Sequence, residues 1–96
     1  MKLNFTWDNT KAAKNLEKHR VSFEEAQTVF DNPLAVILPD PAHSSEELRE
    51  IIIGHSVNDR LLLISFTERQ DSIRIISARR ATTKEQRDYE SGTNFF

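Results

Sequence analysis

The sequence predicts one α+β domain, with an antiparallel sheet of four to five strands, two N-terminal helices and one C-terminal helix in the order β-α-α-β-β-β-β-α. Apolar residues recur at helical spacing in two segments near the N-terminus and in one near the C-terminus. Between them, extended runs follow one another through short polar turns, which favour antiparallel neighbours. Helices and strands that are kept apart are typical of the α+β class. The 96 residues support a single core, so residues 1–96 are expected to form one domain.

The N-terminal third is predicted to contain a short strand and two helices. Residues 3–7 (LNFTW) have alternating aromatics, as a strand has. Asp8 then caps a helix from about residue 9 to about residue 18, with an apolar face made of Ala12, Ala13 and Leu16. Ser22 and Glu25 form a capping box for the next helix, which ends at residues 31–33 (DNP). The apolar stripe of this second helix consists of Phe23, Ala26, Val29 and Phe30.

Four strands and a last helix are expected in the remainder. The strands are predicted at residues 34–38, 49–56, 60–67 and 72–78. Gly54 lies inside one of them and indicates a bulge or a close backbone approach. Thr82 and Glu85 form a second capping box, and the helix that they start ends at Ser91-Gly92.

Composition and charge exclude several functions. The net charge of −2 and the pI near 5.9 do not suit a general nucleic-acid coat, so any RNA would bind through a local patch. The longest apolar run, LAVIL, is far too short to span a membrane, and no signal-like stretch is present, so we expect a cytoplasmic protein. The chain has no cysteine, which excludes disulfides and thiolate chemistry.

Three histidines are candidates for chemistry. His19 has two interpretations: a histidine favoured by the dipole at a helix C-terminus, or a general base or acid that titrates near neutral pH. The spacing of His19, His43 and His55 matches no compact metal motif, so we expect neither a metal nor another cofactor.

The segment of residues 74–90 brings cations to the start of a helix, which is a natural place for phosphate. If strand pairing stays regular, Arg74 and Arg80 share one face and Arg79 lies on the other. The alternative is a solvated strand edge that resists aggregation. Glu68 beside Arg69 is either a proton acceptor near these cations or a surface ion pair.

Four segments of the chain match a family pattern, in order: FTWD and KAAKNLEKH in residues 5–19, VSFEEAQTVFDNP in 21–33, TER in 67–69 and RIISARRATTKEQRDYE in 74–90. In these segments the chain resembles the BrnT family of toxins from type II toxin-antitoxin systems, which are similar to RelE-like ribonucleases. This resemblance implies a RelE-like fold, a bacterial cytoplasmic setting and inhibition of translation by RNA cleavage. It also implies neutralisation by a cognate antitoxin with a ribbon-helix-helix DNA-binding domain, through which alone the protein would meet operator DNA.

The family's KH dipeptide falls on Lys18 and His19, and its SAR segment falls on residues 77–79. Metal-independent RNA cleavage needs a base, an acid and cations for the developing phosphorane charge. We therefore assign the base or acid role to His19 or Glu68, phosphate stabilisation to Arg74, Arg79 and Arg80, and RNA binding to Lys18, Arg69 and Lys84. The alternative is a catalytically silent binding module that acts with its antitoxin as a transcriptional co-repressor.

One position departs from the family pattern. Glycine usually follows the KH dipeptide, whereas this chain has Arg20. Glycine is the usual residue in a left-handed helix cap, so this turn either bends differently or carries strain.

Overall fold

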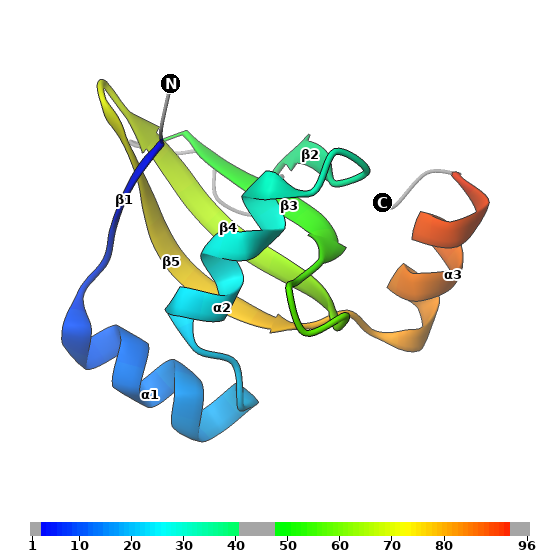
Figure 1. Cartoon of the computed structure of the whole chain (residues 1–96), viewed down its shortest axis with the longest axis horizontal. Coiled ribbons are helices and arrows are strands. Elements are labelled where there is room, and N and C mark those ends of the chain that lie inside the picture. The colour runs from blue at the N-terminus through cyan, green and yellow to red at the C-terminus, as the bar shows by residue number, and fades with distance from the viewer. Residues whose placement is uncertain (1–2, 41–47, 93–96) are drawn as a thin grey trace.

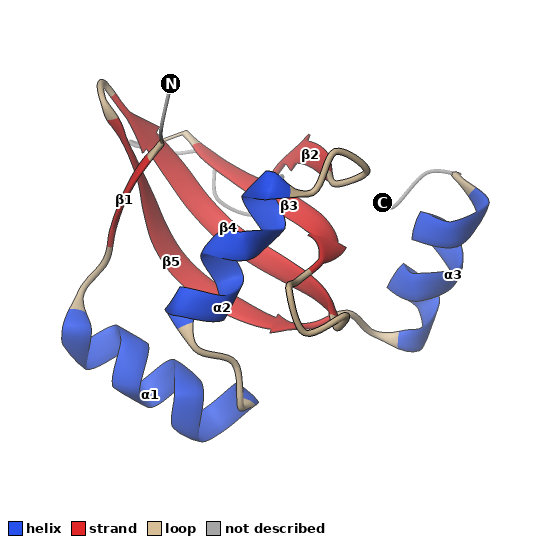
Figure 2. Ribbon diagram, viewed as in Figure 1, coloured by secondary structure: helices blue, strands red, loops and turns tan. Residues whose placement is uncertain are grey.

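The computed structural model describes residues 3–40 and 48–92 and confirms the α+β class (Figure 1). Helix α2 crosses one face of the sheet. In the view of Figure 2, α1 lies below the sheet and α3 lies to its right. The elements are β1 (Asn4–Thr6), α1 (Asn9–His19), α2 (Phe23–Thr28), the 3-10 helix η1 (Val29–Asp31), β2 (Val36–Pro39), β3 (Arg49–His55), β4 (Leu61–Arg69), β5 (Ser72–Arg80) and α3 (Thr83–Ser91).

The sheet is mixed, which corrects the expectation of an antiparallel sheet. Its strand order is β1-β5-β4-β3-β2, and the pairs from β2 to β5 are antiparallel as predicted. Strand β1, however, runs parallel to β5, with Phe5 beside Ile73. The prediction rested on short links between strands, and no such link joins β1 to β5. Their relative direction is therefore set by packing between distant parts of the chain.

The hydrophobic core lies between the sheet and the helices. Three of the four residues predicted for the apolar stripe of α2, Phe23, Ala26 and Val29, are fully buried, and Phe30 packs against the core. They contact the apolar side chains of the facing sheet residues Ile52, Leu62, Ile64, Phe66, Ile73, Ile75 and Ala78. Helix α1 differs from its prediction, because Leu16 is 47% exposed and the buried residue of this helix is Asn15.

A β-bulge in β5 reverses the predicted alternation of its arginines. Ser77 pairs with Ser65 and Ile75 with Phe66, so that Ile76 is left without a partner in the ladder. Ile75 and Ala78 consequently face the same core although they are three residues apart. Arg80 therefore lies on the helix-covered face, whereas Arg74 and Arg79 lie on the second face. The prediction that Arg74 and Arg80 share a face is wrong, because it assumed regular pairing.

Several local signals in the sequence are confirmed. Asp8 caps α1, and Thr82 with Glu85 forms a complete capping box at α3. Gly92 ends α3 in the left-handed conformation with φ 73°. At Gly54, a Cβ atom would lie 2.8 Å from the Cβ of Ala35, so this glycine permits the close approach that its position in the strand indicated.

Candidate active site

The end of α1 is attached to the end of β5 by a single buried side chain. The amide nitrogen of Asn15 donates to the Ala78 carbonyl at 2.8 Å and to the Val21 carbonyl at 2.9 Å. Its amide oxygen accepts from the Ala78 N–H at 3.1 Å. His19 follows Asn15 by four residues and therefore lies one turn further along the same side of the helix. This places His19 toward the last residues of β5.

Helix α1 ends at Arg20 in the left-handed conformation, with φ 59° and ψ 31°. The Arg20 N–H donates to the Leu16 carbonyl at 2.9 Å, which closes the last turn of the helix. This is the geometry that glycine adopts most readily. The turn therefore bends as a glycine turn would, and the arginine adopts a strained conformation at this position.

Arg60 connects this cap to α2. Its Nη2 donates to the Arg20 carbonyl at 3.0 Å, and its Nε donates to Oε2 of Glu25 at 3.0 Å. A second, very short contact joins Nη2 to Oε1 of Glu25, and the hydroxyl of Ser56 donates to Oε2 at 2.6 Å. Glu25 thus gives only half of the predicted capping box: its N–H donates to Ser22, but its carboxylate binds Arg60.

The charge state of Glu25 follows from these contacts. Hydrogen bonds from the Arg60 guanidinium lower its pKa from 4.5 to about 2 against the opposing effect of burial, and the bond from Ser56 adds to the lowering. A general base works best with a pKa near the working pH. Glu25 is therefore a structural carboxylate, although it lies close to the candidate site.

Arg79 is occupied by an ion pair on the second face of the sheet. Its Nη1 and Nη2 donate to the two carboxylate oxygens of Glu85 at 2.8 and 2.9 Å. The same carboxylate accepts from the Thr82 N–H at 2.8 Å as part of the capping box. The Arg79 hydrogen bonds lower the pKa of Glu85 from 4.5 to about 2, so the pair remains charged at neutral pH.

Arg80 is the arginine that faces the same side of the sheet as α1. Its side chain is exposed and has no hydrogen-bond or ion-pair partner among residues 3–40 and 48–92. Two links place it beside the end of α1. Arg60 binds the carbonyl of Arg20, the residue after His19, while the next residue, Leu61, accepts from the N–H of Ala81, the residue after Arg80.

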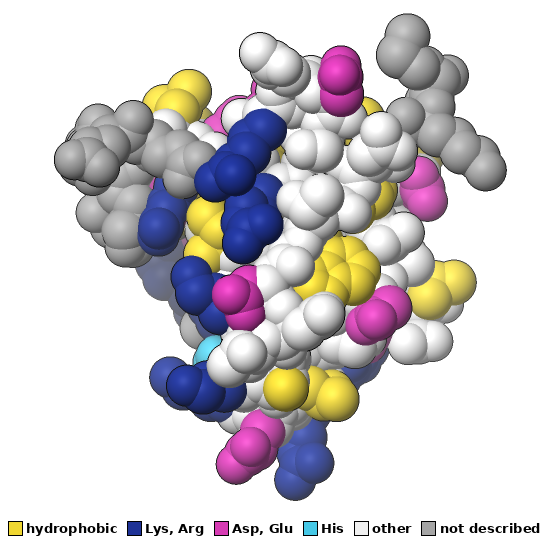
Figure 3. Space-filling view, turned by 90° about the vertical axis from the view of Figure 1, so that its left-hand side faces the viewer, with side chains coloured by type: hydrophobic (Ala, Val, Ile, Leu, Met, Phe, Trp, Pro, Cys, Tyr) yellow, Lys and Arg dark blue, Asp and Glu magenta, His cyan; other side chains and the backbone are white. Residues whose placement is uncertain are grey.

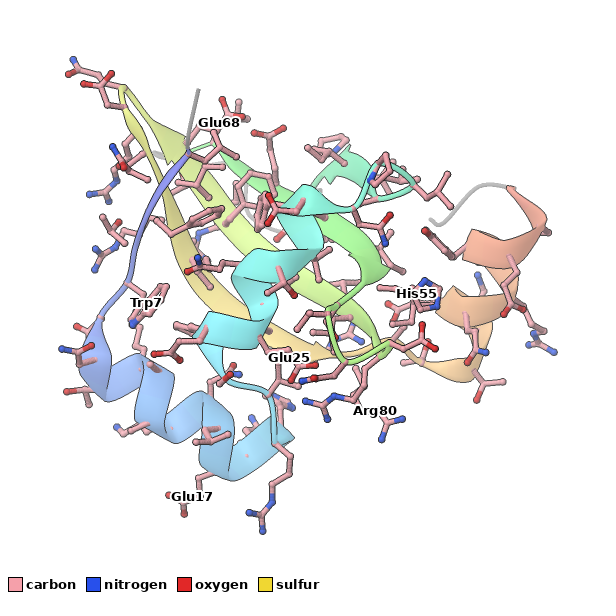
Figure 4. All side chains as sticks on the ribbon, viewed as in Figure 1. Trp7, Glu17, Glu25, His55, Glu68 and Arg80 are labelled. Carbon is pink, nitrogen blue, oxygen red and sulfur yellow. The ribbon has the colours of Figure 1, made fainter. Side chains whose placement is uncertain are left out.

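The structure divides the predicted site residues into two groups. Lys18 and His19 lie at the end of α1 and Arg79 and Arg80 at the end of β5, while Lys84, whose ammonium is 2.7 Å from Asp88, lies in the first turn of α3, which follows β5. Glu68, Arg69 and Arg74 lie toward the β4–β5 turn. Glu68 is five residues along β4 from Leu63, the partner of Arg79, which corresponds to ~17 Å. Figure 4 shows Glu68 and Arg80 at opposite ends of the sheet.

Three residues of this region were missed by sequence reasoning. The sequence analysis does not single out Asn15, assigns Glu25 to a helix cap, and takes Arg60 as the first residue of a strand. A signal existed only for Asn15, which is four residues before His19 on the same side of the helix. The pairing of Arg60 with Glu25, 35 residues away, depends on the tertiary fold.

One face of the molecule is cationic along one of its halves. On the face drawn in Figure 3, Lys and Arg side chains gather along one half in a band from top to bottom. A hollow of about 490 Å³ lies at the β4–β5 turn instead, lined by residues including Leu3, Glu68 and Ser72. Within residues 3–40 and 48–92, no three His, Asp or Glu side chains gather as metal ligands, and no helix is long and apolar enough to cross a membrane. His43 lies outside these residues.

Known proteins resemble the chain over most of its length. A family model described as the ribonuclease toxin BrnT of type II toxin-antitoxin systems matches residues 7–85. The crystal structure of the Brucella abortus ribonuclease toxin BrnT matches with a TM-score of 0.66 and 21% identity, over 85% of this chain and 100% of that chain. At this identity the match concerns the fold, which the two proteins share. None of the curated proteins matches the chain.

Proposed function

The chain belongs to the BrnT family, the ribonuclease toxins of type II toxin-antitoxin systems, and on this premise we propose that it is an endoribonuclease that cleaves RNA without a metal ion. The observation that carries this proposal is the attachment of α1 to β5. Asn15 binds both backbone groups of Ala78, two residues before Arg80 and one helical turn before His19. A titratable imidazole and an unpaired guanidinium are thereby held at the same end of the sheet.

The proposed mechanism uses His19 as the general base. It removes the proton of the ribose 2′-hydroxyl, whose oxygen attacks the adjacent phosphorus to form a 2′,3′-cyclic phosphate, while the bond to the 5′-oxygen breaks and that oxygen takes up a proton from water. Arg80 stabilises the negative charge that develops on the phosphorane oxygens, because its guanidinium is free to bind them in a bidentate manner. Lys18 and Lys84 extend the cationic surface toward the flanking phosphates.

The residues at the other end of the sheet receive a different role. Glu68 lies ~17 Å along β4 from the level of Arg79, too far to exchange a proton with a phosphate beside His19. We therefore assign no catalytic step to Glu68. Arg69 and Arg74 are proposed to contact the phosphates of RNA that continues across the second face. Arg79, which is paired with Glu85, supports α3 and contacts RNA only at its exposed edge.

We place this activity in the bacterial cytoplasm, where cleavage of RNA would inhibit translation. An antitoxin partner follows from the type II family, and we propose that it carries a ribbon-helix-helix domain that neutralises the toxin and links it to operator DNA. The other candidate, a silent co-repressor, shares this partner and differs only in lacking cleavage. Activity measurements therefore separate the two functions.

The test compares purified wild-type protein, free of antitoxin, with His19→Ala and Arg80→Ala in the presence of EDTA. The wild type is expected to cleave RNA, and each variant is expected to lose about 100-fold or more in kcat, as removal of a catalytic base or a charge-stabilising donor does. The matched control is Arg87→Ala, an exposed cation of α3. If the wild type leaves RNA intact while its antitoxin complex still binds the operator, the co-repressor function holds instead.

A further inference from the structure

The left-handed cap after His19 is held by hydrogen bonds from two directions. Asn15 binds the Val21 carbonyl on one side, and Arg60 binds the Arg20 carbonyl on the other, at 2.9 and 3.0 Å. We propose that Arg60 is a positioning residue for RNA cleavage: by binding the Arg20 carbonyl it holds the end of α1 so that His19 faces the end of β5. This inference rests on the proposed role of His19.

An arginine in the left-handed region tends to leave it, because its Cβ crowds the following carbonyl. If Arg20 relaxed to right-handed helical angles, α1 would continue and the carbonyl of Arg20 would turn along the helix axis. The hydrogen bond from Arg60 would then be lost, and the chain would enter Val21 in a different direction. Val21 is fully buried, so its position cannot change without disturbing the core. Arg60 therefore stabilises the conformation that glycine would adopt unaided.

The guanidinium shape is essential to this role. Arg60 donates to both oxygens of Glu25 and to the Arg20 carbonyl at the same time, and its planar fork directs these donors to two separate groups. A lysine ammonium is a compact charge that can remain beside Glu25 but does not span both partners. Arg60→Lys consequently keeps the Glu25 carboxylate paired while it releases the Arg20 carbonyl. This variant separates the positioning role from the need to neutralise a buried charge.

Glu25 and Ser56 are the supports of Arg60. Ser56 belongs to the turn between β3 and β4, and its hydroxyl also accepts from the Asn58 N–H at 3.2 Å. The turn, α2 and the cap of α1 are therefore joined in one hydrogen-bonded unit. Because the pKa of Glu25 is lowered to about 2, its carboxylate is charged throughout the neutral range and these hydrogen bonds persist there.

The experiment compares the wild type with Arg60→Lys, Arg20→Gly and the double variant Arg20→Gly/Arg60→Lys. We expect Arg60→Lys to lower kcat by about 10- to 100-fold with a KM near that of the wild type. Displacing a catalytic group by about an ångström lowers the rate by a factor of this order. Glycine adopts the cap conformation without assistance, so the double variant should recover most of kcat. In parallel, the three-bond HN–Hα coupling of Arg20, which reports its φ, should change in Arg60→Lys.

The control variant is Val29→Ala, which truncates a fully buried side chain of η1 away from the cap. Measured under conditions where all variants are folded, its kcat should equal that of the wild type, and adding Arg20→Gly should not raise it. An unchanged kcat or an unchanged Arg20 coupling in Arg60→Lys overturns the proposal, as does a loss that Arg20→Gly fails to restore. Failure of the proposed function is seen separately, as undiminished cleavage by His19→Ala.

Discussion

Replacing Arg20 by glycine should stabilise the protein. The left-handed conformation at φ 59° costs a residue with a side chain about 1–2 kcal/mol. Glycine avoids this cost. It also loses more conformational freedom on folding, and this loss cancels about 0.5–1 kcal/mol of the gain. The expected net gain in the free energy of unfolding is therefore about 0.5–1 kcal/mol. For a domain of this size the gain corresponds to a rise in Tm of roughly 2–8 °C.

Chemical denaturation followed by circular dichroism measures this change, and Asp59→Gly provides the matched comparison. Asp59 is the other non-glycine residue with positive φ among residues 3–40 and 48–92, also at 59°. Aspartate tolerates the left-handed region better than arginine does. Asp59→Gly should therefore raise the free energy of unfolding by less than half as much as Arg20→Gly. Equal gains at both positions, or a loss at Arg20, would refute the argument that the cap is strained because it carries an arginine.

Three further outcomes are expected. Glu25 and Glu85 have pKa values lowered to about 2, so the stability that they supply is complete above pH 4.5 and should be lost as the pH falls from about 4.5 to about 2, measured as Tm against pH. Gly54→Ala should cost about 1–3 kcal/mol, because its Cβ would lie 2.8 Å from that of Ala35; a denaturation midpoint like that of the wild type would exclude this clash. Asn15→Ala should cost about 2–3 kcal/mol by leaving the buried N–H and carbonyl of Ala78 unpaired, and hydrogen exchange at the Ala78 amide should accelerate.

Local chemistry explains which features the sequence could predict. Asp8, Thr82 and Gly92 act on backbone groups within a few residues of themselves, so their roles as caps follow from their spacing. The bulge at Ile76 has no such signal. The apolar and polar residues of SIRIISARR alternate well enough to fit a strand with the bulge or without it. Only pairing with β4 shows that Phe66 opposes Ile75 and that Ser65 opposes Ser77.

A residue of the candidate site could be predicted where its immediate neighbours in the sequence indicate its role. His19 and the arginine pair were identified from their neighbours in the sequence, whereas the partners of these residues come from distant elements. Glu25 illustrates the difficulty: three residues after Ser22 it satisfies a capping pattern, yet its carboxylate makes stronger, charge-assisted bonds with Arg60. When a tertiary partner offers such bonds, a local pattern predicts the element correctly and the role of the side chain incorrectly.

The adjacent arginines show why geometry has to decide between residues that a family pattern treats together. The resemblance pointed to Arg79, which directs its two Nη atoms at Glu85 on the second face. Glu85 stays charged down to about pH 2, so a phosphate would have to displace a carboxylate to bind these donors. Arg80 faces the side of α1 and has no side-chain partner within residues 3–40 and 48–92. We therefore propose that Arg80 and not Arg79 binds the phosphate, and Arg80→Ala should reduce kcat more than Arg79→Ala does.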